Sequence, residues 1–206
     1  MGYCIRYTAC MGIGVWQMTF AVNGNSSTPA VFRAKLNWSH EESVFYNAII
    51  NSVGIIGIAL GSILGGFLIR NGRRRTMLIS QLLAILASSI AMYLSLYTLC
   101  ASKVLLGMSA GIMNLAFPKM IIETIPQHLA PKFALAHRMS ITIGLVPLFS
   151  MAALLPDADD EEANRADEMW RVIWLAPGVV GLFVILLIVK AYRLEPVTFC
   201  LVKGLK

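Results

Sequence analysis

Residues 46–75 read YNAIINSVGIIGIALGSILGGFLIRNGRRR, an apolar run that ends in a short glycine turn and a group of arginines. A helix needs roughly 20 predominantly apolar residues to cross the hydrocarbon core of a bilayer. Arginine and lysine are enriched in the cytoplasmic connections of membrane proteins. The stretch therefore predicts a membrane-spanning helix over residues 46–69, followed by a tight turn on the cytoplasmic side.

The composition of the whole chain also indicates a membrane protein. Hydrophobic residues make up 57% of the 206 residues and charged residues 14%, and the mean hydropathy is +0.71. A soluble domain carries about 25% charged residues, so most of this surface is expected to face lipid. We predict a single all-α membrane domain over residues 1–206, a bundle of six transmembrane helices, with 193–206 as the start of a cytoplasmic linker. The predicted spans are 3–22, 46–69, 76–99, 102–125, 133–155 and 172–192, and a cleavable signal peptide is the alternative for the first of them.

The charges between the apolar runs predict the orientation of the chain. Arg70 and residues 73–75 follow the second span, whereas the acidic segment 157–168 precedes the sixth. The positive-inside rule then places both termini in the cytoplasm. Asn25 and Asn37 begin Asn-x-Ser sequons in a connection predicted to be external, so both are candidate glycosylation sites. Both the plasma membrane and an internal membrane fit this pattern.

Other classes of protein fit the sequence poorly. The net charge is +6, but the basic residues gather at the ends of apolar runs rather than beside stacking aromatics, so no nucleic acid partner is expected. The four cysteines have neither metal-ligand spacing nor that of a disulfide framework. The sequence contains no Walker loop and no nucleophile elbow. We therefore expect no enzyme activity, no cofactor and no metal site.

Small residues recur at three- and four-residue steps in two of the predicted spans. Such spacing places them on one face of a helix. In lipid, helices associate through close backbone contact, which small residues allow. We expect either ordinary close packing within the bundle or a sliding contact between the second span and a partner. The residues are Gly54, Gly57, Gly61 and Gly65 in the second span, and Gly107 and Gly111 in the fourth.

The segment 61–75, GSILGGFLIRNGRRR, resembles the signature loop of the major facilitator superfamily. That signature reads Gly, three residues, Asp, a basic residue, any residue, Gly and two basic residues, and it joins the second and third helices of the family. The resemblance implies a gating and ion-pair role for Arg70, Gly72, Arg73 and Arg74. Ile69 departs from the pattern, because the family has there an aspartate that helps to latch its two halves together.

Further segments resemble the N-terminal six-helix half of the sugar porter family. That half consists of two inverted three-helix repeats. The family's fourth helix usually begins this pattern with Arg, where the chain has Lys103. The matching segments are KVLLGMSAG at 103–111, PKMIIETIP at 118–126, ITIG at 141–144, the Trp170-Arg171 pair, and LEPVTF at 194–199.

The resemblance implies a transporter of sugar or a related small polar solute. The first predicted span holds no acidic residue, so facilitated diffusion is expected rather than proton coupling. A second six-helix bundle would complete the solute path, either as a missing C-terminal half or as a copy of this chain. Besides the lipid bilayer, the expected partners are that bundle and a hexose-like solute. The alternative is a degenerate homologue that serves as a structural or regulatory membrane subunit.

The resemblance also suggests individual site residues. Glu123, with Arg73 or Arg74 as its natural partner, and Lys103 join the gating and ion-pair set. Arg138 stands where related porters carry a sugar-binding glutamine, and it would either suit an anionic solute or pair with Glu123. Gln17 could donate hydrogen bonds to a solute or to neighbouring helices. The candidate substrate-binding residues are Gln17, Arg138, Ile141 and Leu145.

Overall fold

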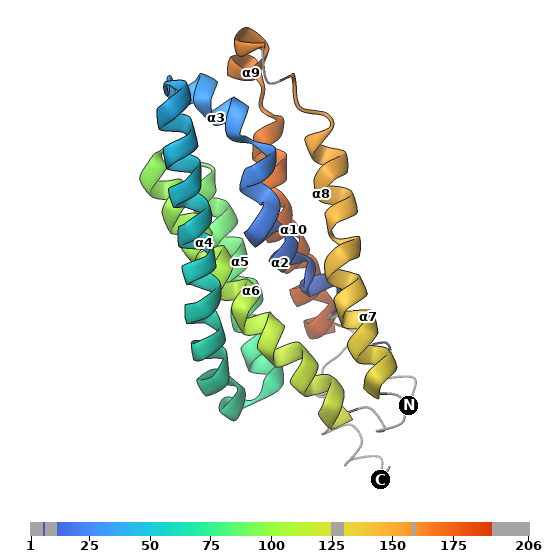
Figure 1. The fold of residues 1–206 in the computed structure, drawn as a ribbon. Helices are drawn as coiled ribbons and strands as arrows, with labels where there is room; N and C mark the ends of the chain where they lie inside the picture. The colour runs from blue at the N-terminus through green and yellow to red at the C-terminus, as the bar shows by residue number, and fades with distance from the viewer. Residues whose placement is uncertain (1–5, 7–11, 125–129, 158–159, 191–206) are drawn as a thin grey trace.

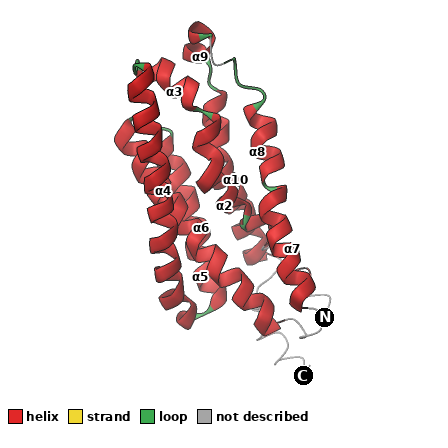
Figure 2. Cartoon of the chain, in the orientation of Figure 1, coloured by secondary structure: helices red, strands yellow, loops and turns green. Residues whose placement is uncertain are grey.

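The computed structural model describes residue 6 and residues 12–124, 130–157 and 160–190. Within these ranges every regular element is a helix (Figure 2), and the long helices run side by side as a bundle (Figure 1). The predicted linker at 193–206 lies outside the described residues. The elements are α2 (Trp16–Asn23), η1 (Gly24–Ser27), α3 (Pro29–Leu36), α4 (His40–Leu68), η2 (Ile69–Asn71), α5 (Arg73–Ala91), α6 (Leu96–Thr124), α7 (Ala130–Ile143), α8 (Leu145–Ala152), α9 (Glu161–Ala166) and α10 (Met169–Lys190).

The two ends of the bundle differ in character. At one end α3 and α9 pack together (Figure 1), and the Arg33 guanidinium lies 2.6 Å from a carboxylate oxygen of Glu161. At the opposite end η2 joins α4 to α5 (Figure 1). We call these the α3–α9 end and the η2 end.

α4 begins earlier than its apolar run does. The Ser39 hydroxyl accepts the Glu42 backbone N–H at 3.2 Å, and the Glu42 carboxylate accepts the Ser39 N–H at 2.9 Å. This capping box starts the helix at His40. After η2, Gly72 has φ 114°, a conformation that favours glycine, and the chain reverses there into α5. Hydropathy alone gives a later start at residue 46, because the cap lies among polar residues.

The glycine faces of α4 and α6 pack directly against each other. A Cβ added to Gly61 would lie 2.2 Å from the carbonyl oxygen of Met108, and one added to Gly111 would lie 2.2 Å from that of Ile58. Such separations leave no room for any side chain, so backbone meets backbone. The repeated small residues therefore provide close packing within the bundle, and this face of α4 is not available to another partner.

Four of the described helices are long and apolar enough to cross a membrane. α5 has 19 residues and is more polar than these four helices, since it carries several hydroxyl and amide side chains. Ser80 and Gln81 are among them, and both are buried against neighbouring helices. The first predicted span, 3–22, is described in part, and α2 covers its end. The four are His40–Asn71, Leu96–Glu123, Ala130–Ala152 and Met169–Lys190.

The fifth predicted span, 133–155, is divided in two. α7 ends at Ile143 and α8 begins at Leu145, with Gly144 between them. Pro147 has no N–H to offer the carbonyl of Ile143, which weakens the helix at this point. α2 also approaches closely here, since a Cβ added to Gly144 would lie 3.0 Å from the Thr19 hydroxyl oxygen. The predicted fifth span therefore consists of two consecutive helices, α7 and α8, and Ala130–Ala152 as a whole is long and apolar enough to cross a membrane.

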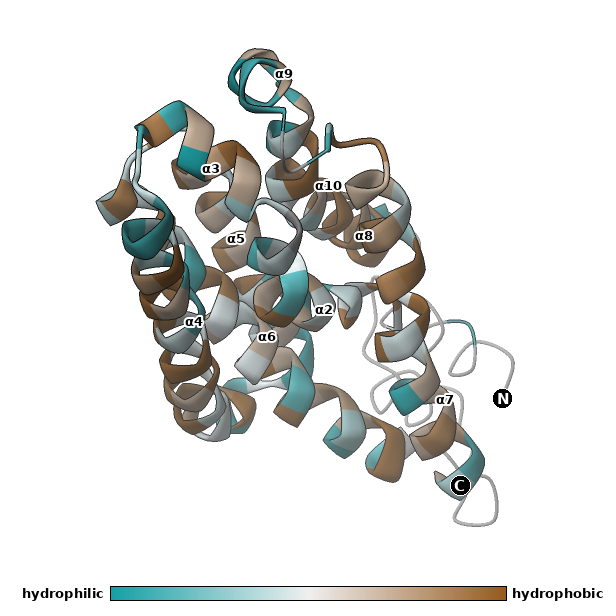
Figure 3. Cartoon of the chain, turned by 45° about the horizontal axis from the view of Figure 1, so that its top comes forward, coloured by the Kyte–Doolittle hydropathy of each residue, from teal (hydrophilic) through white to brown (hydrophobic). Residues whose placement is uncertain are grey.

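The outside of the bundle is apolar along most of its length. Figure 3 shows hydrophobic colouring along α4 and hydrophilic colouring on α9. Large apolar side chains point outward from α4, including Ile56, Ile63 and Phe67, each more than half exposed. Exposed apolar surface of this extent is costly in water and suits lipid.

Candidate functional site

A polar cluster inside the bundle joins α2, α5 and α6. The Gln17 amide donates to the side-chain oxygen of Gln81 at 2.5 Å, and the Ser109 hydroxyl donates to the side-chain oxygen of Gln17 at 2.8 Å. Ser80 in turn donates to the carbonyl of Ser109 at 2.9 Å. Gln17 is 0% exposed. Of the two roles predicted for Gln17, the structure forms the hydrogen bonds to neighbouring helices, and solute contact stays a prediction.

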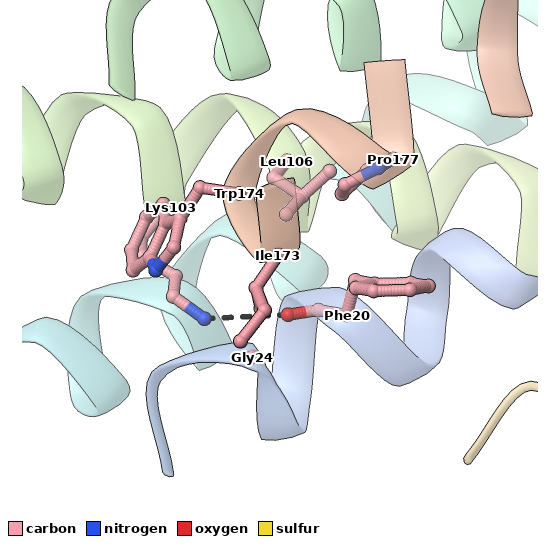
Figure 4. A pocket seen from close by; sticks show the side chains of 7 residues that line it. All are labelled: Phe20, Gly24, Lys103, Leu106, Ile173, Trp174 and Pro177. Atoms are coloured by element: carbon pink, nitrogen blue, oxygen red, sulfur yellow. Dashed lines mark hydrogen bonds between the residues drawn. The ribbon is translucent and has the colours of Figure 1, made fainter. Parts of the chain in front are cut away.

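Lys103 is buried at the point where α2 passes into η1. Its side chain extends from α6, and its ammonium donates to the carbonyls of Phe20 at 3.3 Å and Ala21 at 3.1 Å. The ammonium lies 5.0 Å from the ring centre of Trp174 on α10. Figure 4 shows Lys103, Phe20 and Trp174 around a small cavity, which has a volume of about 10 Å³. The lysine thus links three helices and is only 1% exposed.

This position separates Lys103 from the other predicted gating residues. Lys103 lies 20 residues before Glu123 on one helix, which is roughly 30 Å at about 1.5 Å per residue. The Lys103 ammonium contacts two carbonyl oxygens and an aromatic ring. Positive charge near the last carbonyls of a helix is favourable, so Lys103 stabilises the end of α2.

An ion pair joins α5 and α6 at the η2 end. Arg73 Nε lies 2.6 Å from one carboxylate oxygen of Glu123, and Arg73 Nη2 lies 2.6 Å from the other. This two-point geometry is the strongest that arginine and a carboxylate can form. It ties the start of α5 to the last turn of α6 beside the Gly72 turn.

Two further residues of the signature loop differ from each other in exposure. Arg70 is exposed at the end of η2, whereas Ile69 is 4% exposed. Ile69 belongs to an apolar cluster that includes Met77 and Met113. The position that holds an aspartate in the family pattern therefore serves apolar packing in this chain.

We expect the Arg73–Glu123 pair to make a measurable contribution to stability. Both side chains are partly exposed, so the coupling energy should be about 1 kcal/mol rather than that of a buried pair. Glu123→Gln and Arg73→Gln, alone and together, form a double-mutant cycle read by thermal unfolding in detergent. If the loss of stability in the double variant equals the sum of the losses in the two single variants, the pair is an incidental contact.

The candidate solute residues of the fifth span lie along α7 and α8. Arg138 is exposed, and Ile141 and Leu145 are half-buried. The carbonyl of Ile141 accepts a hydrogen bond from the Thr19 hydroxyl at 2.7 Å, which fixes this part of α7 against α2. Glu123 uses both carboxylate oxygens for Arg73, so the alternative pairing of Glu123 with Arg138 is not formed. Solute contact by Arg138, Ile141 and Leu145 stays a prediction.

The two candidate glycosylation sites have opposite environments. Asn25 is 1% exposed and its amide donates to Asn47 at 3.2 Å. A glycan on Asn25 does not fit this structure, because η1 turns that side chain into the bundle. Asn37 is exposed, and its side-chain oxygen accepts from Arg165 at 2.6 Å. Glycosylation of Asn37 stays a prediction.

Several polar residues of the site were absent from the predicted set. Gln81 belongs to the buried cluster, and Trp174 lies beside the Lys103 ammonium. Polar side chains within apolar runs were the available signal, since such groups are costly in a membrane. By that criterion Asn47 and Asn51, inside the second predicted span, also stand out.

These features define an integral, multi-pass membrane protein with an α-helical bundle and a polar interior. Residues 10–198 match the family model of the Major Facilitator Superfamily. The chain therefore belongs to the Major Facilitator Superfamily, a family of transporters.

Curated relatives match over most of the chain. Hexose transporter 1 of Toxoplasma gondii is 23% identical over 219 residues, which cover 94% of this chain and 39% of that protein. Hexose transporter 1 of Plasmodium falciparum (isolate 3D7) is 27% identical over 171 residues, which cover 77% and 33%. The chain thus spans about a third of the length of these relatives.

Solved structures share the fold. The proton:xylose symporter XylE bound to 6-bromo-6-deoxy-D-glucose superposes with a TM-score of 0.80 at 17% identity, covering 99% of this chain and 47% of that one. The inward open conformation of XylE from E. coli gives a TM-score of 0.76 at 16% identity, covering 91% and 48%. The fold of this chain is therefore that of about half of such a transporter.

Proposed function

We propose that this chain forms one six-helix half of a transporter for a hexose or a related polyol. The observation that carries the proposal is the match of 77–94% of the chain to hexose transporters. This similarity favours transport over a purely structural or regulatory role. The first span supplies no acidic residue, which supports facilitated diffusion.

The proposal includes a second six-helix bundle. Transporters built from such halves bind solute between the two bundles. Only a small part of α7 and α8 is buried within this bundle, so a second bundle has a surface to cover. We also propose that the η2 end faces the cytoplasm together with both termini, because the arginines gather there.

The test is uptake of radiolabelled D-glucose by membrane vesicles from cells that produce the protein. Vesicles from cells lacking it provide the baseline, and the protein keeps whatever partners the cells supply. We expect faster uptake that saturates with glucose concentration and falls in Glu123→Gln. Glu41→Gln, an exposed acid at the other end of the bundle, should leave uptake unchanged. Uptake at the baseline rate would contradict the proposal.

A further inference from the structure

A cleft opens between α3 and the first turns of α4 at the α3–α9 end. Figure 1 shows the two helices side by side there. The cleft has a volume of about 550 Å³ and is wide open on its outer side. It lies apart from the polar cluster around Gln17 and from the Arg73–Glu123 pair. The residues that matter are Ala30, Arg33, His40, Asn47, Ala48 and Asn51.

One face of α4 presents polar side chains to this cleft. His40, Ser43, Asn47 and Asn51 recur at steps of three and four residues, so they share that face. Most of the remaining surface of α4 is apolar. Amide side chains are costly within a membrane segment unless they are hydrogen-bonded. Their concentration on the cleft side therefore needs a reason other than lipid contact.

The amides at this face have hydrogen-bonding capacity left over. Asn47 donates to the Ser43 carbonyl at 2.7 Å and accepts from Asn25 at 3.2 Å. Asn25 lies on η1 and does not line the cleft, and its buried side-chain oxygen has no partner within the described part of the chain. Asn51 lines the cleft, and its buried side-chain oxygen likewise has no partner among the described residues. Unsatisfied buried groups of this kind are uncommon. The Asn51 oxygen is closed off from the cleft as placed, so a solute reaches it only when the amide rotates about its terminal bond.

The charge of the lining indicates which solute would fit. Among the described residues no carboxylate lines the cleft. The Arg33 guanidinium, which does line it, is paired with Glu161 at 2.6 Å. Ala30, Val44 and Ala48 add apolar surface. Neutral amides beside small apolar groups suit an uncharged solute with many hydroxyls and C–H faces, rather than an anion.

We propose that the α3–α4 cleft is an outer binding site for an uncharged polyol such as a hexose, with Asn51 as its main hydrogen-bonding side chain. The inference rests on the proposed function for its solute class. It adds a site that shares no residue with the polar cluster around Gln17 or with the Arg73–Glu123 pair.

The test is protection of an introduced cysteine in the complete protein in lipid nanodiscs. His40→Cys places a thiol at the mouth of the cleft, and a polar maleimide reports its accessibility. We expect D-glucose to slow labelling, by about half when half of the sites are occupied. Glu41→Cys, the exposed neighbouring position, should label at the same rate with and without glucose. Labelling of the unchanged protein gives the background from the native cysteines, and this background is subtracted. Equal effects at both positions, or none at either, would overturn the proposal.

A second pair of variants tests the chemistry of the site. Asn51→Leu, added to His40→Cys, removes the amide at similar volume and should abolish protection. Ser52→Leu, at the next and exposed position, should preserve it. Protection that survives Asn51→Leu would overturn the assignment. If Asn51→Leu does not fold, Ala48→Phe fills the cleft from an exposed position and must abolish protection, with Ala59→Phe on the same helix as its control.

The two proposals fail in different ways. Glucose uptake without protection at His40→Cys would contradict the outer site and leave the transport proposal standing. Protection at His40→Cys without uptake would contradict transport and leave a polyol site.

Discussion

Replacing Gly61 with alanine is expected to destabilise the bundle by at least the upper end of the roughly 1–3 kcal/mol that overpacking costs. The new methyl carbon would lie 2.2 Å from the carbonyl oxygen of Met108. The obstructing atom belongs to the α6 backbone, so no side-chain rotation can relieve the overlap. α4 and α6 must therefore separate along their contact. The measurement is the thermal midpoint of unfolding in detergent, together with the fraction of monodisperse protein.

Gly66→Ala is the matched control on the same helix. The nearest atom to a Cβ there is a leucine methyl of Leu115 at 3.9 Å, an ordinary contact. Alanine also has the higher helix propensity, so stability should stay within about 0.5 kcal/mol of the unchanged protein or rise. Equal midpoints for Gly61→Ala and Gly66→Ala would show that α4 and α6 do not approach as closely as the structure places them.

Replacing Lys103 with glutamate is expected to prevent stable folding. The ammonium is 1% exposed and donates to the carbonyls of Phe20 and Ala21. A carboxylate there would be repelled by both oxygens and would lose the contact with Trp174. An uncompensated buried charge costs several kcal/mol. We expect little or no monodisperse Lys103→Glu protein after extraction in detergent.

Two further variants isolate the reason for this loss. Lys119→Glu makes the same substitution at an exposed position of α6 and should be extracted as well as the unchanged protein. Lys103→Met keeps most of the side-chain volume but leaves the α2 carbonyls without their donor, which costs about 1–3 kcal/mol. Stability should therefore fall from the unchanged protein to Lys103→Met and further to Lys103→Glu. Good recovery of Lys103→Glu would contradict the buried position of this lysine.

Hydropathy and small-residue spacing predicted much of the fold. The apolar runs located most of the long helices, because a bilayer imposes a similar length on each of them. The predicted third span, 76–99, is wrong at its end, because α5 ends at Ala91 and α6 begins at Leu96. The steps between Gly54, Gly57, Gly61 and Gly65 predicted a close-packed face, although not that α6 covers it. Hydropathy did not predict the start of α4, which is set by the capping box at Ser39. It also did not predict the break at Gly144, where α2 packs closely. Both depend on hydrogen bonds or neighbours that an apolar count does not register.

The candidate site was less accessible to sequence reasoning. Glu123 could be assigned to Arg73 or Arg74 in advance, since they lie at the same end of adjacent spans and carry opposite charges, and the structure shows the pair with Arg73. The partners of Gln17 could not be predicted. A glutamine in an apolar span can hydrogen-bond either to another helix or to a solute, and the sequence looks the same in both cases. Lys103 was assigned to the gating and ion-pair residues because of its position in the family pattern. Its contacts with the end of α2 follow only from three-dimensional packing.

We propose that this chain provides one bundle of a two-bundle hexose transporter, and the protein mass of the glucose-transporting particle tests this proposal. The particle is extracted in lipid nanodiscs and its mass is determined by native mass spectrometry. We expect two six-helix bundles in that particle, and so a protein mass about twice the 22.6 kDa of this chain, or more. A particle that contains a single 22.6 kDa chain and still carries glucose into vesicles after reconstitution would contradict it.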